Sequence, residues 1–123
     1  MSYVYAIVDK TTNKVIYVGS TKRNIKTRFK EHCRDIKNNK HNIKKLNTYK
    51  DNIDCLEVRE LICLNTDNSL ILSFTEQLFN SIYKPFNKCV IKGAYGTVTL
   101  ARCDMELANK LIEAIRIYCG IMR

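Results

Sequence analysis

The N-terminal part of the chain has the residue pattern of a β-hairpin. β-branched and aromatic residues fill positions 3–8 and 15–18, and the polar stretch 9–14 between them has the composition of a turn. If Tyr5 pairs with Tyr17, paired positions sum to 22 and the loop has three residues. Both phenols then point to one face of the sheet, whereas a two- or four-residue loop without a bulge would separate them.

A helical period follows the hairpin. Asn24 is a suitable N-cap, and apolar residues at positions 25, 29, 33 and 36 recur at the spacing of one helical stripe. Arg28 and His32 stand four residues apart beside that stripe, so their side chains are neighbours along one edge of the helix. We expect this pair to reach a common ligand at the border of the sheet.

A short helix and a third strand are predicted in the middle of the chain. The basic helix covers roughly residues 43–49. The strand covers residues 55–64, with Leu56, Val58 and Ile62 on one face. These residues extend the hairpin to three strands.

A longer helix is predicted over residues 67–83, where apolar residues recur at positions 71, 74, 78 and 82. It ends at Pro85, because proline disfavours helical backbone at the residue before it. Beyond it, the pattern indicates a short strand at 98–101 and a final helix capped by Asp104. The buried face of that last helix is predicted to be Leu107, Leu111, Ile112 and Ile115.

The order of these elements predicts an α+β fold in two parts. Residues 1–90 form the main domain, and residues 91–123 form a C-terminal strand-and-helix extension. The extension is too short for an independent domain. We therefore expect it to pack on the first domain, on a partner protein or on a second copy of the chain.

Composition and length are those of one compact intracellular domain. The 123 residues are 46% hydrophobic and 27% charged, with one proline and four glycines, which argues against a fibrous or disordered chain. The apolar runs are too short to cross a bilayer, and the N-terminus lacks the pattern of a secretory signal. We therefore expect an intracellular protein that is not secreted and does not bind a membrane. The six cysteines lack the spacing of zinc ligands, which disfavours a zinc-stabilised interaction protein.

The net charge of +9 comes from one segment of the sequence. Positions 22–50 contain eleven Lys and Arg and two acidic residues, 11 − 2 = +9, while the other 94 residues have ten of each sign. Such a segment is typical of a surface that binds a polyanion, although a basic run by itself is more often a solvated helical face. The residues predicted to contact phosphates are Lys22, Arg23, Lys26, Lys30, Lys44 and Lys45.

Six short motifs occur between residues 3 and 87, and they carry most of the candidate chemistry. They are Tyr3-Val4-Tyr5, Tyr17-Val18-Gly19, Gly19-Ser20-Thr21, Arg28-Phe29-Lys30-Glu31-His32, Glu76 and Lys84-Pro85-Phe86-Asn87. In this order and spacing they resemble the GIY-YIG nuclease family, although Tyr3 stands where that family has its first glycine. The resemblance implies a small three-stranded antiparallel sheet flanked by helices, with endonuclease activity on DNA.

The resemblance also implies an active site, composed of Tyr5, Tyr17, Arg28, His32, Glu76 and Asn87. Glu76 would bind one divalent ion, Mg²⁺ or Mn²⁺, and Arg28 would donate hydrogen bonds to a phosphate oxygen. One of the two phenols would orient or deprotonate the attacking water, and the choice stays open with Tyr5 slightly favoured.

Two site residues have less direct roles in this hypothesis. His32 would relay a proton or hold a tyrosine hydroxyl. Asn87 would pin the loop after Pro85 and position a phosphate, because a neutral amide does not transfer protons. The first hypothesis is therefore a metal-dependent DNA endonuclease, and the alternative is a nucleic-acid-binding module of the same fold that does not cleave.

Overall fold

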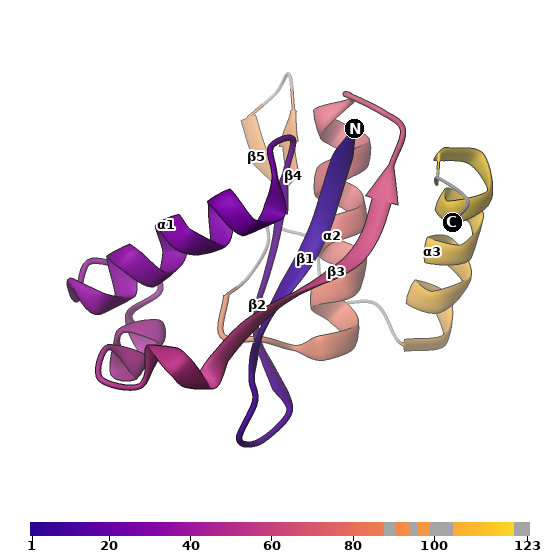
Figure 1. The fold of residues 1–123 in the computed structure, drawn as a ribbon. Helices are drawn as coiled ribbons and strands as arrows, with labels where there is room; N and C mark the ends of the chain where they lie inside the picture. The colour runs from indigo at the N-terminus through magenta and orange to yellow at the C-terminus, as the bar shows by residue number, and fades with distance from the viewer. Residues whose placement is uncertain (88–90, 94–95, 99–104, 120–123) are drawn as a thin grey trace.

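The structure, a computed structural model, describes residues 1–87, 91–93, 96–98 and 105–119. A three-stranded antiparallel sheet in the order β2-β1-β3 lies between helices, and β4 and β5 form a separate two-stranded ladder (Figure 1). This arrangement confirms the predicted α+β fold. The described elements are β1 (Ser2–Asp9), β2 (Lys14–Thr21), α1 (Ile25–Lys37), the 3-10 helices η1 (Lys44–Tyr49) and η2 (Ile53–Cys55), β3 (Leu56–Leu64), α2 (Ser69–Tyr83), β4 (Ile91–Gly93), β5 (Gly96–Val98) and α3 (Met105–Cys119).

The hairpin of β1 and β2 pairs in a register different from the predicted one. Tyr5 lies opposite Gly19 and Tyr17 lies opposite Ile7, so the predicted Tyr5–Tyr17 pair is wrong. Four loop residues separate the paired strand ends, and Ile16 is left unpaired as a bulge in β2. The bulge offsets the extra loop residue and returns Tyr17 to the face of Tyr5. The prediction that the two phenols share a face is confirmed.

A second bulge, in β3, moves the end of that strand to the other face of the sheet. The register against β1 shifts at Leu61. Leu56 and Val58 consequently pack on the α1 side, whereas Ile62 belongs to the core on the α2 side. The prediction that these three residues share one face is therefore wrong at Ile62, because regular alternation stops at a bulge.

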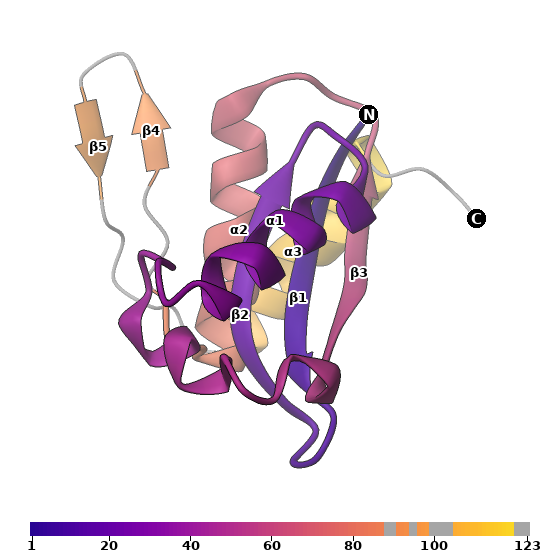
Figure 2. The same ribbon diagram turned by 60° about the vertical axis from the view of Figure 1, so that its left-hand side comes forward.

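The sheet separates two hydrophobic cores. Figure 2 shows α1 covering one face, with α2 and α3 behind the other. The fully buried residues of the α1 side include Tyr5, Ile7 and Ile36, and those of the opposite side include Val4 and Val18. Burying each such apolar side chain contributes roughly 1.5–3 kcal/mol, so both faces hold the strands in place. The face that carries Tyr5 is thus a rigid surface closed by α1.

Local signals determine where α1 and α2 begin and end. The side chain of Asn24, as predicted, accepts hydrogen bonds from two main-chain N–H groups of the first turn of α1, and Asn68 caps α2 in the same way. After Tyr83, Lys84 adopts a left-handed conformation with φ 47°, and Pro85 follows. The predicted end of α2 is confirmed, since proline prevents its continuation.

The remaining predictions are met in part. The basic helix predicted over 43–49 is the 3-10 helix η1. On α3, Ala108 and Ile112 are buried against the core, while Leu107 is 46% exposed, so the prediction of a buried Leu107 is wrong. The small Ala108 side chain, rather than Leu107, occupies the buried position against the core.

Some predictions fall outside the described residues. Of the strand predicted at 98–101, only Val98 is described, at the end of β5, and the capping residue Asp104 lies outside. The division of the chain near residue 90 stays a prediction, although α3 contributes Ala108 and Ile112 to the core beneath β1. In the described part of the chain, no helix has the length and apolar character needed to span a membrane.

Candidate active site

The two predicted phenols meet on the α1 side of the sheet, beside Gly19. The rings of Tyr5 and Tyr17 lie 6.2 Å apart between centroids at an angle of 29°. A Cβ atom on Gly19 would lie 2.6 Å from the hydroxyl oxygen of Tyr5 and 2.7 Å from the Tyr17 ring. The glycine in Tyr17-Val18-Gly19 is therefore required for space, because the cross-strand ring of Tyr5 folds over it.

His32 joins the two phenols from α1. Its Nε2 lies 2.7 Å from the Tyr5 hydroxyl oxygen, and its ring centroid lies 4.7 Å from that of Tyr17. His32 and Tyr5 are each 1% exposed. The structure therefore brings together three residues that are 27 positions apart at most, from three different elements.

His41 is a further member of the cluster, and it was missed from the sequence. Its Nε2 lies 2.8 Å from Nδ1 of His32, and its Nδ1 accepts a hydrogen bond of 3.0 Å from the main-chain N–H of Ile43. Asn47 holds the segment in place by two hydrogen bonds to the His41 main chain. The one available signal was that His41 is the only other histidine of the chain and lies in the same basic segment.

Arg28 sets the electrostatic character of the cluster. Its positive charge lowers the pKa of Tyr5, which burial and the neighbouring Tyr17 raise well above its ordinary value. The same charge lowers the pKa values of His32 and His41, in each case after the larger effect of burial. Arg28 also lies 3.7 Å from the carboxylate of Glu31, which keeps the guanidinium positioned on the helix edge.

Glu76 lies on α2, which packs against the edge strand β2. Its negative charge acts on Tyr5 and raises the pKa of that phenol, opposite to the effect of Arg28. The charges of Arg28 and of Glu76, the predicted metal ligand, thus both act on the pKa of Tyr5.

Asn87 fixes the chain after α2 to the outer edge of β2. Its side chain accepts a hydrogen bond of 3.1 Å from the Val18 N–H and donates one of 2.8 Å to the Val18 carbonyl oxygen. Asn80 on α2 in turn donates to the main-chain oxygen of Asn87 at 2.8 Å. These contacts support the predicted role of Asn87 in pinning the loop.

The donor set suits one hard divalent cation bound together with substrate. No group of three or more His, Cys, Asp or Glu side chains that could hold a metal occurs among the described residues. Mg²⁺ commonly keeps several waters and binds one or two carboxylates plus phosphate oxygens. The carboxylate of Glu76, whose charge acts on Tyr5, fits this requirement.

The six predicted phosphate-contacting residues are all exposed. Two of them already have partners within the protein: Lys22 donates to the carbonyl oxygen of Asp67 and to Ser69, and Arg23 pairs with Glu31. The others lie on α1, which carries His32, and on η1, which follows His41 in the chain. Lys45 also lies over the ring of Phe86. The basic segment therefore presents exposed charges on the two elements that flank the histidines.

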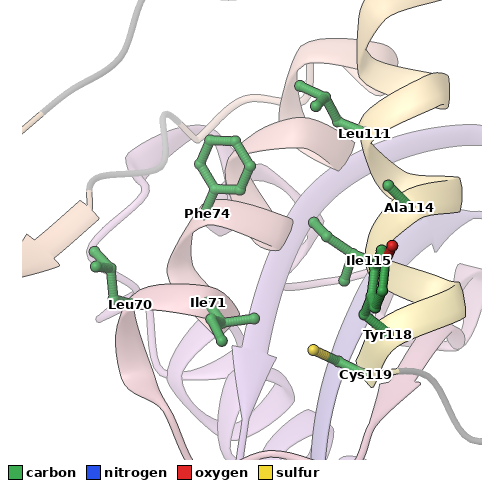
Figure 3. Close-up of a pocket in the computed structure, with 8 residues that line it drawn as sticks. All are labelled: Leu70, Ile71, Phe74, Leu111, Ala114, Ile115, Tyr118 and Cys119. Carbon is green, nitrogen blue, oxygen red and sulfur yellow. The ribbon is translucent and has the colours of Figure 1, made fainter.

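An apolar hollow of about 460 Å³ lies elsewhere, between α2 and α3 (Figure 3). Its wall includes Ile71, Phe74, Ile115 and Tyr118, and it lies on the face of the sheet opposite α1. It contains none of the predicted catalytic residues. We therefore place the candidate active site at the tyrosine–histidine cluster rather than in this apolar hollow.

Comparison with known proteins identifies the family. The model of the GIY-YIG catalytic domain matches residues 1–88, and the chain therefore belongs to the GIY-YIG family. It is a nuclease of this class, and its substrate is nucleic acid. The sequence finds no match among curated proteins.

A solved structure has a similar fold. It is the catalytic domain of the intron endonuclease I-TevI, in a mutant form, with 20% sequence identity and a TM-score of 0.55. The similarity covers 84% of this chain and 96% of that one. At this level of identity the match supports the fold.

Acidification is expected to destabilise the protein through His32. Burial, followed by the charges of Arg28 and His41, lowers the pKa of His32 from 6.5 to about 3 in the folded state. Between these values the unfolded chain binds a proton that the folded chain does not, so the free energy of unfolding falls as pH falls. This group alone contributes about 1.4 kcal/mol per pH unit below its unfolded pKa.

Urea unfolding at a series of pH values between about 5 and 7.5 measures this effect. A His32→Gln variant has no imidazole to protonate at this position and is expected to show a flatter dependence. Equal slopes for wild type and variant would show that His32 does not titrate as described.

Replacing Gly19 by alanine is expected to displace the two phenols. The added Cβ would collide with Tyr5, and the backbone at Gly19 is not in the left-handed region, so crowding alone causes the effect. We expect a loss of about 1–3 kcal/mol in the free energy of unfolding and a lower rate of cleavage. Thermal unfolding and a nuclease assay measure the two effects, with Ser20→Ala as the neighbouring control. A Gly19→Ala protein as stable and active as wild type would contradict the crowding.

Proposed function

We propose that this protein hydrolyses DNA phosphodiester bonds with one divalent cation, Mg²⁺ or Mn²⁺, held by Glu76. The observation that carries the proposal is the cluster of Tyr5, Tyr17 and His32, on which the charges of Arg28 and Glu76 both act. The exposed lysines of α1 and η1 support a DNA substrate, since they offer contacts to phosphates.

Each residue of the site has a separate role in the proposed hydrolysis. When bound, the cation would stabilise negative charge on the phosphate and on the departing oxygen. Arg28 donates N–H groups to a non-bridging phosphate oxygen, a role suited to a planar group that keeps its charge. A tyrosine of the Tyr5–Tyr17 pair orients the attacking water and, in its phenolate form, takes up the proton of that water. Asn87 keeps β2 and the loop after α2 in place.

The proposal is tested by incubating the protein with supercoiled, single-stranded, flapped and branched DNA and with an RNA strand. We expect cleavage of DNA with Mg²⁺ or Mn²⁺ that stops on addition of EDTA. Binding without cleavage of any substrate would favour the non-cleaving module. Cleavage that EDTA leaves unchanged would exclude the role of the cation.

Replacing Arg28 by lysine is expected to lower the rate of cleavage about a hundredfold. Lysine keeps a positive charge but cannot present the planar pair of donors that contacts a phosphate oxygen. Single-turnover cleavage at saturating protein measures the effect, and Arg34→Lys, on an exposed position of the same helix, is the control. Similar losses in the two variants would show that general charge, rather than the geometry of Arg28, supports the reaction.

A further inference from the structure

The hydrogen bonds that reach Tyr5 begin at a main-chain amide, and this gives them a direction. The N–H of Ile43 lies 3.0 Å from Nδ1 of His41, Nε2 of His41 lies 2.8 Å from Nδ1 of His32, and Nε2 of His32 lies 2.7 Å from the Tyr5 oxygen. A main-chain N–H can only donate. Every later member of the chain must be consistent with that first donor.

The first donor determines which nitrogen of each ring carries hydrogen. Because Nδ1 of His41 accepts from Ile43, a neutral His41 carries its hydrogen on Nε2 and donates it to Nδ1 of His32. His32 then carries its own hydrogen on Nε2 and donates it to the oxygen of Tyr5. The opposite arrangement would direct the Nδ1–H of His41 against the N–H of Ile43, which leaves two donors facing each other.

Burial supports the neutral state that this reasoning requires. His32 is 1% exposed and His41 is 8% exposed. Burial is the main cause that lowers the pKa of both rings; Arg28 and His41 lower that of His32 further, and for His41 the charge of Asp35 opposes the effect of Arg28. Neither ring is expected to be an imidazolium at neutral pH.

The chain of donors continues from Tyr5 to Tyr17. Since the Tyr5 oxygen accepts from His32, its own hydroxyl hydrogen is available to Tyr17, whose ring lies 6.2 Å from that of Tyr5 between centroids, at an angle of 29°. A hydrogen bond with Tyr17 also raises the pKa of Tyr5, as donation does. Tyr5 is 1% exposed, whereas Tyr17 is only partly buried. The last acceptor of the chain is thus also the more accessible phenol.

We propose that the Ile43 amide, His41, His32 and Tyr5 form a one-way series of hydrogen-bond donors that ends on the oxygen of Tyr17. In this arrangement His41 is a positioning residue that determines the tautomer of His32. Tyr17, rather than Tyr5, is the tyrosine that faces water, and its phenolate form, stabilised by the hydroxyl of Tyr5, takes up the proton of that water. The part of this inference that concerns catalysis rests on the proposed nuclease function, whereas the direction of the hydrogen bonds does not.

The direction is tested by nitrogen NMR of the protein labelled with ¹⁵N in its histidines, at neutral pH and without metal. We expect both rings to be neutral and to carry hydrogen on Nε2. Hydrogen on Nδ1 of His32 or His41, or an imidazolium signal from either ring, would overturn the proposal. The measurement is made on the wild-type protein and gives an answer whether or not the protein cleaves DNA.

Two variants of His41 test its role as a positioning residue. In His41→Gln the amide nitrogen can replace Nε2 as a donor to His32, whereas His41→Leu removes the donor. We expect His32 to remain in the Nε2–H tautomer in the glutamine variant and to become a mixture of tautomers in the leucine variant. An unchanged tautomer in a folded leucine variant would show that His41 does not determine the direction.

The assignment of Tyr17 is tested by alkaline titration of the protein labelled with ¹³C at the tyrosine Cζ atoms. We expect Tyr17 to ionise at lower pH than Tyr5, and ionisation of Tyr5 first would overturn the assignment. If DNA is cleaved, the leucine variant should lose about tenfold or more in kcat with little change in KM, and the glutamine variant should recover most of it. A loss confined to KM would place His41 in substrate binding instead.

Discussion

Glu76→Gln is expected to reduce the rate of DNA cleavage about a thousandfold while leaving DNA binding nearly unchanged. Losing the cation's share of charge stabilisation costs several kcal/mol in the transition state, and each 1.4 kcal/mol is a factor of ten in rate. The amide has the size of the carboxylate, so packing on α2 is preserved. It lacks the negative charge that a hard divalent ion requires of its protein ligand.

Single-turnover cleavage and DNA binding, measured in parallel at fixed salt, separate the two effects. Glu106→Gln is the matched control, because that carboxylate lies on α3 and is 81% exposed. Glu76→Asp should restore part of the activity at raised Mn²⁺ concentration, since it returns the charge at a shorter reach. Equal rates for wild type and Glu76→Gln would remove Glu76 from the site and leave the cation without its proposed ligand.

Asn87→Ala is expected to lower the free energy of unfolding by about 3 kcal/mol. Its amide satisfies both the N–H and the carbonyl oxygen of Val18, in contacts that are buried. Alanine would leave these two groups of the edge strand unpaired, and each buried unpaired group costs about 1–3 kcal/mol. The loop after α2 would keep the hydrogen bond from the Phe86 N–H to the Ile16 carbonyl oxygen as a main-chain contact with β2, and cleavage should fall with the loss of stability.

Urea unfolding of Asn87→Ala and of the exposed control Asn42→Ala measures this cost. The control is expected to stay within about 0.5 kcal/mol of wild type. If Asn87→Ala is as stable as wild type but does not cleave, the side chain acts on the substrate rather than on the fold.

The elements that the sequence predicted correctly are those determined by nearby residues. Asn24 caps α1 with its own side chain, and Pro85 ends α2 by preventing helical backbone just before it. The strands β1 and β3 were found near their observed bounds because β-branched and aromatic residues fill them. These are interactions within one turn or one strand, and they can be read without knowing the partners.

The errors concern residues whose neighbours lie far away in the sequence. The bulges at Ile16 and Leu61 place side chains that regular alternation would put on the other face, and so the pairing of Tyr17 and the side of Ile62 were wrong. His41 was missed because no spacing on a helix or strand joins it to His32. The two rings are brought together instead by the segment between α1 and η1, which carries His41.

The sequence by itself determined that this is an α+β nuclease-family domain with a basic segment beside two tyrosines, an arginine, a histidine and a glutamate. Only the tertiary structure decided that the two phenols meet over Gly19 and that two buried histidines connect them to a main-chain amide. The physical reason is that residue types and caps act locally. The register of a sheet and the direction of a buried hydrogen-bond chain depend instead on packing between distant segments.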